Sequence, residues 1–321
     1  MPSVSVLPYQ PDRKNEWDTF VATAKNGLFL FRRDYMDYHA DRFPDASLLF
    51  YDERGRLIAL LPATLRDGVL SSHAGLTFGG VISGDGMKVE AMLGLFEALL
   101  STLRAQNVSA LIYKAIPHIY HRVPAEEDLY ALFRHGARLS RRDVSATIDR
   151  RERLPVSKGR QSALAQAEKH NLEVRQSSDF RAFMAIEEDV LRSRYDARPT
   201  HSAAELQLLA GRFPENIKLF GAYRNTALLA GVIIYESAQV AHAQYIGAGD
   251  EGRELGALDL ILSHLIDNYY ADKAYFDFGI STEQEGHHLN AGLIANKQSY
   301  GARAVMYDHY RLDLSAQPHD R

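Results

Sequence analysis

Residues Val240 to Ser281 read VAHAQYIGAGDEGRELGALDLILSHLIDNYYADKAYFDFGIS, and this stretch decides the fold. Val240 to Ala248 is predicted as a strand because it carries β-branched and aromatic residues. Glycines then interrupt the pattern, and Gly256 to Tyr270 has apolar residues at helical spacing, which predicts a helix. Ala274 to Ile280 is predicted as a second strand. The connection is long enough for a right-handed crossover between parallel neighbouring strands.

The loop between the first strand and the helix contains the glycines Gly247, Gly249 and Gly252. A helix that begins straight after a glycine-rich turn presents free backbone N–H groups and the positive end of its dipole. The loop is therefore a candidate site for a phosphate or pyrophosphate group. Simple helix capping is the alternative, because a glycine-rich helix start alone is a weak signal.

Composition is that of a soluble globular protein and disfavours several classes of function. The chain has 321 residues, 46% hydrophobic and 24% charged, which is comfortable for two domains. A net charge of −4 disfavours bulk binding of nucleic acid, and the absence of cysteine excludes disulfides and a thiolate nucleophile. The N-terminus lacks a signal-peptide pattern and no apolar run approaches about 18 residues, so we expect a cytoplasmic protein without a membrane span.

The second half of the chain repeats the order of elements of the first. A shift of 171 residues places Leu48, in a predicted hairpin at Ser47 to Leu65, on Leu219, in a predicted hairpin at Lys218 to Glu236. In each half a strand with glycines, a helix and a strand follow the hairpin. An old internal duplication leaves such a pattern. We therefore predict an α/β protein with mixed sheets and two similar domains in tandem, residues 1–150 and 151–321.

The segment from Asp149 to Arg175 between the two halves is rich in arginine and lysine. A run of like charges usually faces solvent, so we predict a helical connector; a basic arm that holds a phosphorylated substrate is the alternative. The other predicted elements are helices at Glu16 to Ala24, Phe29 to Arg42, Val89 to Leu103, Phe180 to Arg192 and Ala203 to Arg212, an extended stretch at Val69 to Ile82, and strands at Val108 to Ile116 and Ser145 to Ile148.

Several short segments resemble the Fem-type transferases, which are built from two GNAT-like acyltransferase domains. Tyr275 to Ile280 (YFDFGI) is similar to the family's YDFGG-type strand, and Lys297 to Ala302 (KQSYGA) to its K-x-x-F-G segment. In the first half, Gly75 to Gly80 (GLTFGG) is similar to the family's G-L-x-Y-G-G strand. The resemblance covers most of residues 25–314 and implies two tandem GNAT-like domains. Two features depart from it: no helical hairpin arm for gripping tRNA is evident, and Arg253 to Leu258 meets the pyrophosphate pattern R/Q-x-x-G-x-G/A only in part.

The resemblance implies attack of an amine on an activated acyl group, promoted mostly by positioning and electrostatics. His242 lies on the strand where GNAT chemistry takes place, and histidine side chains in general titrate near neutral pH, so His242 is the first candidate for the base. A half-buried histidine that bonds to a neighbour is the alternative. Asp277, between two phenylalanines, either binds an amine or caps a neighbouring loop. Tyr300 is a further catalytic candidate.

The remaining candidates are contacts for two substrates. The end of the first strand, the loop and the helix start would hold acyl-CoA: Ile246, Gly247, Ala248, Arg253, Glu254, Leu255, Gly256 and Ala257. Polar side chains at strand ends and in the Lys297 segment would contact the acceptor: His73, Lys114, His118, His121, Gln244, Glu283 and Lys297. Gln244 shares a face with His242 in a regular strand, and Lys297 pairs either with an anionic group or in an ordinary salt bridge. His118 and His121 have zinc-ligand spacing, but without cysteine or a clear carboxylate partner we expect no metal.

The missing arm and the lack of positive charge disfavour a polyanionic donor. The resemblance then favours an acyl-CoA-dependent N-acyltransferase that acts on a nucleotide-linked amino sugar in surface-polysaccharide biosynthesis. An aminoacyl-tRNA-dependent peptidyltransferase acting on peptidoglycan precursors is the alternative among enzymes, and a non-catalytic binding or scaffold protein is the alternative from another class. We expect no tightly bound cofactor, and a homodimer is the default for a soluble oligomer.

Overall fold

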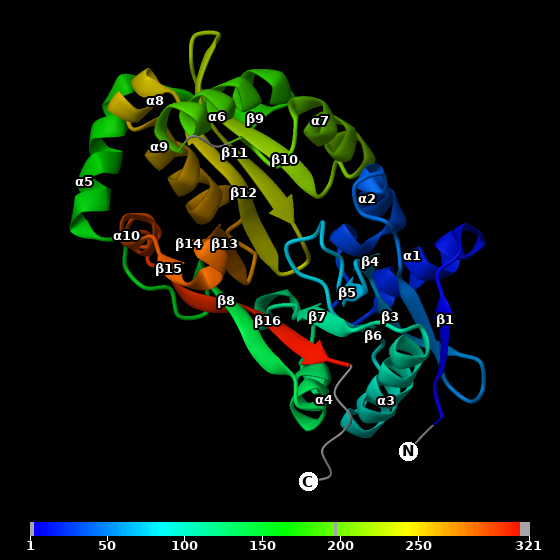
Figure 1. Cartoon of the computed structure of the whole chain (residues 1–321). Coiled ribbons are helices and arrows are strands. Elements are labelled where there is room, and N and C mark those ends of the chain that lie inside the picture. The colour runs from blue at the N-terminus through cyan, green and yellow to red at the C-terminus, as the bar shows by residue number, and fades with distance from the viewer. Residues whose placement is uncertain (1–2, 196–197, 315–321) are drawn as a thin grey trace. The chain divides into compact units, whose positions relative to one another are not determined.

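The computed structural model describes residues 3–195 and 198–314, which Figure 1 draws in colour. The chain divides into two compact units: unit 1 comprises residues 1–143, 283–288 and 306–321, and unit 2 comprises residues 144–282 and 289–305. This division differs from the expected boundary at residue 150. The reason is that β8 (Arg138–Asp149) and β16 (Arg303–Asp313) each contribute residues to both units.

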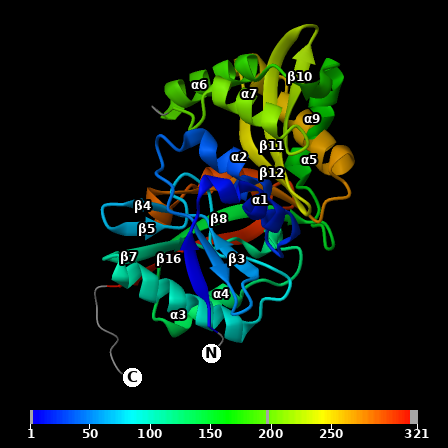
Figure 2. The same cartoon turned by 90° about the vertical axis from the view of Figure 1, so that its right-hand side faces the viewer.

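Unit 1 contains two sheets and a core built on one long amphipathic helix. An antiparallel sheet consists of β1 (Ser5–Pro8), β2 (Leu48–Tyr51), β3 (Leu57–Leu61) and β6 (Ile82–Ser83) (Figure 2). The second sheet begins with β4 (Thr64–Arg66), β5 (Val69–Ser71) and β7 (Ala110–Lys114), followed by residues of β16 and β8. The core helix α3 (Val89–Ala105) buries residues at helical spacing: Met92, Leu95, Phe96, Leu99 and Leu103. α4 (Glu127–Arg134) packs beside it.

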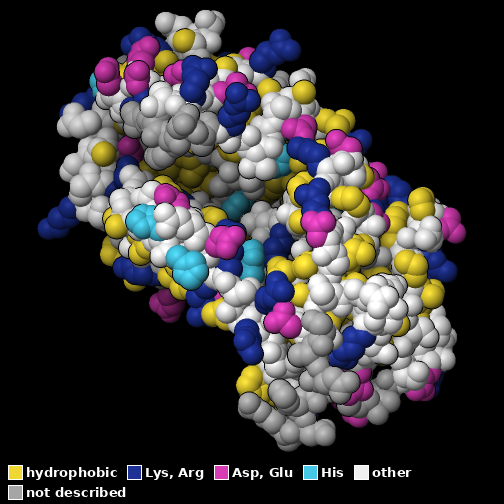
Figure 3. All heavy atoms as spheres, in the orientation of Figure 1, with side chains coloured by type: hydrophobic (Ala, Val, Ile, Leu, Met, Phe, Trp, Pro, Cys, Tyr) yellow, Lys and Arg dark blue, Asp and Glu magenta, His cyan; other side chains and the backbone are white. Residues whose placement is uncertain are grey.

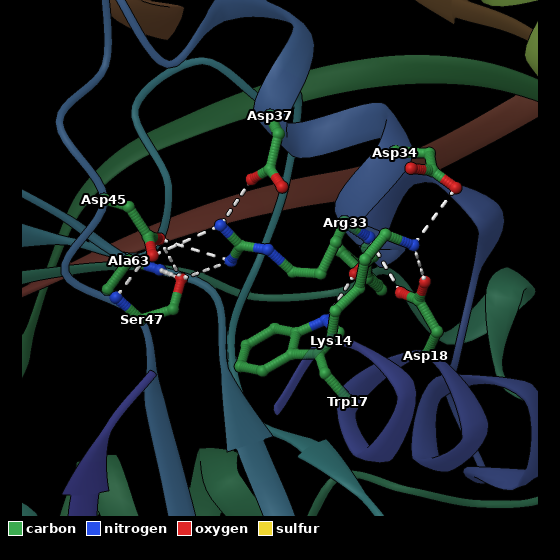
Figure 4. Close-up of polar contacts among 10 residues, drawn as sticks. Lys14, Trp17, Asp18, Arg33, Asp34, Asp37, Asp45, Ser47 and Ala63 are labelled. Atoms are coloured by element: carbon green, nitrogen blue, oxygen red, sulfur yellow. Dashed lines mark hydrogen bonds and ion pairs between the residues drawn. The ribbon is translucent and has the colours of Figure 1, made fainter. Parts of the chain in front are cut away.

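The prediction of a helix from Phe29 to Arg42 is wrong. The segment instead forms two short 3-10 turns around α2 (Arg33–Met36). The indole N–H of Trp17, in α1 (Lys14–Thr23), donates to Phe31 O at 2.7 Å, and this carbonyl is the one that a continuous helix would need. The guanidinium of Arg33 is buried and pairs with Asp37 and Asp45 (Figure 4). It also lies 3.8 Å from the ring centre of Tyr9. Tertiary contacts therefore override the helical pattern here.

Unit 2 is built on a mixed sheet in the order β8-β13-β12-β11-β10-β9. The strands are β9 (Glu173–Ser177), β10 (Ile217–Arg224), β11 (Ala227–Glu236), β12 (Val240–Ala248) and β13 (Tyr275–Ile280) (Figure 1). α6 (Phe180–Tyr195) covers one face, where Phe183 lies against Gly231 and Gly247, and α7 (Ala203–Arg212) packs beside α6. α9 (Ala257–His264) covers the other face, where its Ile261 shares a core with Val232 and Ile234 of β11.

The expected strand, helix and strand from residue 240 to residue 281 are confirmed, and β12 and β13 are parallel. The loop between them is shorter than expected, because α8 (Asp250–Glu254) forms within it and Gly256 then begins α9 in the left-handed conformation, with φ of 67°. The last turn of the helix, Leu265–Tyr269, widens to a π-helix. Among the described residues no helix is long and apolar enough to cross a membrane.

Both predicted hairpins, the helices predicted at residues 16, 89, 180 and 203, and the strand predicted at residue 108 are confirmed, with ends shifted by a few residues. The extended stretch from Val69 to Ile82 forms only β5 and β6, and the residues between them are irregular. The strand predicted from Ser145 to Ile148 is part of the much longer β8, whose exposed first half carries no hydrophobic run to reveal it.

Candidate functional site

β12 and β13, the central strands of unit 2, separate part-way along their length. Their parallel pairing begins at Val240 and ends at His242 and Asp277, whereas β12 continues to Ala248. Beyond His242 one edge of β12 therefore loses its partner strand. A backbone edge without a partner is available to a bound molecule.

The other edge of β12 pairs with β11 but contains a β-bulge. The consecutive residues Ile234 and Ile233 of β11 lie opposite Ala243 and Tyr245, so Gln244 is the extra residue. The expectation that Gln244 shares a face with the histidine two positions before it assumed a regular strand. The bulge removes that premise, so the shared face stays a prediction.

At the point of separation, His242 and Asp277 are hydrogen-bonded to each other. His242 Nδ1 lies 2.7 Å from Asp277 Oδ2, and the hydroxyls of Ser145 and Thr147 donate to Asp277 Oδ1 at 2.5 and 2.7 Å. Burial alone would raise the pKa of the Asp277 carboxyl, but the hydrogen bond and charge of His242 and the two hydroxyls lower the pKa to about 2. Asp277 is thus an ionised acceptor that holds the histidine ring.

The orientation of the His242 ring follows from this contact. Because the carboxylate of Asp277 can only accept, Nδ1 carries the proton of the neutral ring and Nε2 keeps a lone pair. Gly279 has φ of 75°, and a Cβ at this position would lie 3.3 Å from His242 Cε1, so the glycine leaves room for the ring. Lys297 Nζ donates to Gly279 O and Ile280 O at 2.9 and 2.7 Å. Burial lowers the pKa of Lys297 to about 8, although the nearby charge of Asp277 acts to raise it. Through its two hydrogen bonds, the ammonium group of Lys297 fixes the bend of β13.

The open edge of β12 directs main-chain groups toward the space that β13 leaves. Gly249 N–H donates to Leu229 O of β11 at 3.0 Å. Since successive N–H groups of a strand point to opposite edges, those of Ile246 and Ala248 point to the open edge. Arg253 Nη1 donates to Ala248 O at 2.6 Å. The space-filling view shows a hollow with hydrophobic side chains in its depth below α6 and α8 (Figure 3).

The start of α9 is more enclosed than the sequence suggested. A Cβ on Gly256 would lie 2.8 Å from Ala167 Cβ, at the end of α5 (Lys158–Ala167). In the first turn, Asp259 accepts from Arg160 and Tyr300 at 2.5 and 3.1 Å. Burial raises the pKa of the Tyr300 hydroxyl, which points to Asp259 and not to the histidine. A carboxylate here weakens the attraction of the helix start for a phosphate.

The basic connector is in part packed against α9. Arg150 Nη1 donates to Ile266 O at 2.6 Å, and Arg153 pairs with Asp267. Connector and helix together line a cavity of about 400 Å³ that also contains Tyr300. Arg150, Arg153 and Arg160 thus attach the connector to the domain. The alternative of a basic arm that holds a substrate did not predict these contacts.

In unit 1, Lys114 lies among other basic side chains at the end of β7. His309 is its partner residue on β16, and the backbone N–H of Lys114 donates to Ser72 Oγ at 2.7 Å, which places His73 nearby. Burial, assisted by the charge of Arg141, lowers the pKa of Lys114 to about 7. Burial and neighbouring basic groups, including Lys114, lower the pKa of His73 to about 3. The cluster of Lys114, His73 and His309 can lower its electrostatic energy by binding an anion.

The other predicted contacts in unit 1 are dispersed. His118 is exposed, whereas His121 is buried, lies with Nε2 3.1 Å from Ile116 O, and has a pKa lowered to about 4 by burial. Glu283 is exposed in β14 (Thr282–Glu283). No group of three or more His, Cys, Asp or Glu side chains in the described part of the chain is arranged to hold a metal ion.

Residues 150–286 match the family model described as "Acetyltransferase (GNAT) domain". The chain therefore contains a GNAT-type acetyltransferase domain. The GNAT domain contains the diverging strands β12 and β13, with His242 and Asp277 at the point where they separate.

Solved structures share the fold along nearly the whole chain. FemX covers 96% of this chain and 97% of its own, with a TM-score of 0.68 and 10% sequence identity. L-PGS from Bacillus licheniformis matches over 96% of this chain and 93% of its own, with a TM-score of 0.61 and 12% sequence identity. A tandem GNAT protein from the clavulanic acid biosynthesis pathway matches over 99% of this chain and 100% of its own, with a TM-score of 0.52 and 13% sequence identity. The expected α/β fold of two tandem GNAT-like domains is therefore confirmed. No curated protein matches the sequence.

Two residues of the site escaped the sequence analysis. Ser145 and Thr147 precede the matched GNAT domain by a few residues and supply two of the hydrogen bonds to Asp277. Their signal was present, because hydroxyl and apolar residues alternate from Ser145 to Ile148 and so place both hydroxyls on one face of a strand.

Proposed function

We propose that this protein transfers an acyl group from a CoA thioester to the amino group of a nucleotide-linked amino sugar, with His242 as the general base. The observation that carries the proposal is the pair of His242 and Asp277 at the point where the GNAT strands separate. An imidazole whose Nδ1–H donates to an ionised carboxylate is held in place and keeps the Nε2 lone pair free to take a proton.

The proposed reaction uses the open edge of β12. The acceptor amine attacks the thioester carbonyl carbon, and His242 Nε2 takes the proton that the nitrogen loses. A backbone N–H of the open edge, such as that of Ile246, stabilises the oxyanion. The C–S bond then breaks, the carbonyl re-forms as an amide, and the departing thiolate takes up a proton to leave CoA as the thiol. Asp277 remains ionised throughout and stabilises the imidazolium.

The basic cluster of Lys114, His73 and His309 supports an acceptor that carries phosphate groups. These groups have pKa values lowered by burial and by neighbouring basic side chains, so an anion bound to them would be accompanied by proton uptake. A diphosphate that links a nucleoside to an amino sugar is such an anion.

The test is a transfer assay with acetyl-CoA or another short acyl-CoA, in which thiol release and amide formation are both measured. Nucleoside-diphosphate amino sugars and the corresponding free amino sugars are compared as acceptors. We expect transfer to the linked sugars, a much higher KM for the free ones, and a large loss of kcat in His242→Ala. Calorimetry that detects neither CoA nor acyl-CoA binding would exclude this donor. An aminoacyl-tRNA would then be tried as donor, and failure with both donors would favour a binding protein.

A further inference from the structure

Glu187, on α6, is a buried carboxylate for which the described residues provide no counter-charge. Its exposed fraction is 8%, and Oε2 has no hydrogen-bond partner among the described residues. Burial alone raises the pKa of the carboxyl to about 7. A buried acceptor without a donor is costly, and a ligand that donates a hydrogen bond to it would remove that cost.

The carboxylate lies against the main chain of the open strand. A Cβ on Gly247 would overlap Glu187 Oε2, so the glycine is what admits the carboxylate to β12. Phe183, one turn earlier on α6, packs on the same glycine and supplies the apolar surroundings. Gly247 is five residues from His242, which corresponds to roughly 16 Å at about 3.3 Å per residue.

A molecule that lies along the open edge from the histidine to Gly247 would bring its groups next to Glu187. In a CoA thioester, the part that follows the reacting carbonyl is the pantetheine arm, which is uncharged and carries two amide N–H groups and one hydroxyl. In an aminoacyl ester of a nucleic acid, the part at a similar separation carries phosphates. A carboxylate accepts hydrogen bonds from the first and repels the second.

We propose that Glu187 is a specificity-determining residue for the acyl donor: it accepts a hydrogen bond from an amide or hydroxyl group of a pantetheine arm and disfavours a donor with phosphates at that position. The inference rests on the proposed function and names the part of the donor that unit 2 recognises. It requires no change in the chemical step, since Glu187 does not contact the reacting atoms.

The experiment compares Glu187→Ala and Glu187→Gln with Glu188→Gln, an exposed neighbour on the same helix that loses the same charge. Calorimetry measures the Kd of CoA and of pantetheine, which lacks the phosphates of CoA. We expect Glu187→Ala to weaken both by a similar factor of about ten, the value of one hydrogen bond to a charged group. Glu187→Gln retains an acceptor oxygen and should lose less, and Glu188→Gln should match the original chain.

Two results would overturn the inference. Glu187→Ala could bind CoA and pantetheine as the original chain does, or it could lose CoA affinity and keep pantetheine affinity, which would place the contact at the phosphates. Failure of the original chain to bind either molecule overturns the inference together with the proposed function. The isosteric Glu187→Gln, whose Tm is measured first, keeps the test valid if the alanine variant folds poorly.

Discussion

Replacement of Asp277 by asparagine tests the proposed base without removing it. Asparagine has the same shape and can still accept from the hydroxyls of Ser145 and Thr147, but its amide group no longer provides an ionised acceptor for His242 Nδ1–H. The neutral ring then shifts its proton to Nε2 and loses the lone pair that the amine requires. Loss of a positioned base costs about 10²- to 10⁴-fold in rate, so we expect kcat to fall at least a hundredfold while the KM for acyl-CoA stays nearly constant.

The same substitution has a stability effect that can be worked from the pKa. A shift of the Asp277 pKa from 3.8 to about 2 corresponds to roughly 2 kcal/mol of stabilisation of the folded state. Because the folded pKa lies below the unfolded one, this contribution is present above about pH 4 and is lost as the pH falls toward 2. Asp277→Asn should therefore be less stable than the original chain at pH 7, with a flatter acid limb in denaturant titrations.

The assay is steady-state thiol release from acyl-CoA over pH 5.5 to pH 9 (a range of about four units around the ordinary histidine pKa), with the exposed Asp272→Asn as a control for charge. A folded Asp277→Asn variant with kcat within about fivefold of the original would refute the reasoning, since a base without its acceptor cannot be that effective.

Three further predictions concern stability and are checked by denaturant titration. Glu187→Gln should stabilise the protein above pH 7 by roughly 3 kcal/mol, because the pKa of the Glu187 carboxyl is raised from 4.5 to about 7. The cost of ionising this carboxyl in the folded state is absent below about pH 4.5 and grows as the pH rises through 7. Equal stability of both chains at pH 8 would contradict this prediction. Arg33→Met should cost roughly 3 kcal/mol, because Asp37 and Asp45 lose the buried guanidinium between them (Figure 4), and a loss below about 1 kcal/mol would show that the ion pairs add little. Gly256→Ala should cost roughly 1 to 2 kcal/mol through its positive φ and the contact with Ala167, and an unchanged midpoint would argue against both.

The fold was predictable because its deciding stretch has strong local signals. The strand, helix and strand from residue 240 to residue 281 follow from periodicity and from glycine positions, and the crossover rule makes the two strands parallel. The segment from Phe29 to Arg42 shows where this fails. Its aromatic residues suit a helix, but Trp17 and Asp45, at other places in the chain, bind its backbone and its arginine instead.

The candidate site was predictable only in part. His242 and Asp277 were each candidates, yet their hydrogen bond depends on the register of two strands that 26 residues of chain separate, and no pattern gives that register. The bulge at Gln244 could not be predicted either, because it depends on the register of β12 against β11. Gly256 was taken as an open phosphate site, whereas the structure packs Ala167 against it, so a bulky substitution there would disturb packing as well as any ligand. Glu187 gave no signal, because a glutamate on an amphipathic helix ordinarily faces water.

The path of β16 has a consequence for the order in which the protein can fold. In unit 1, β7 lies between β5 and β16, and Leu312 of β16 is the partner residue of Leu111. The nascent chain therefore carries β7 with one bare edge while all of unit 2 is being synthesised, and the edge is covered only when residues near 312 have left the ribosome. A premature stop codon a few residues before Leu312 would thus damage the first-made unit more than the last-made one.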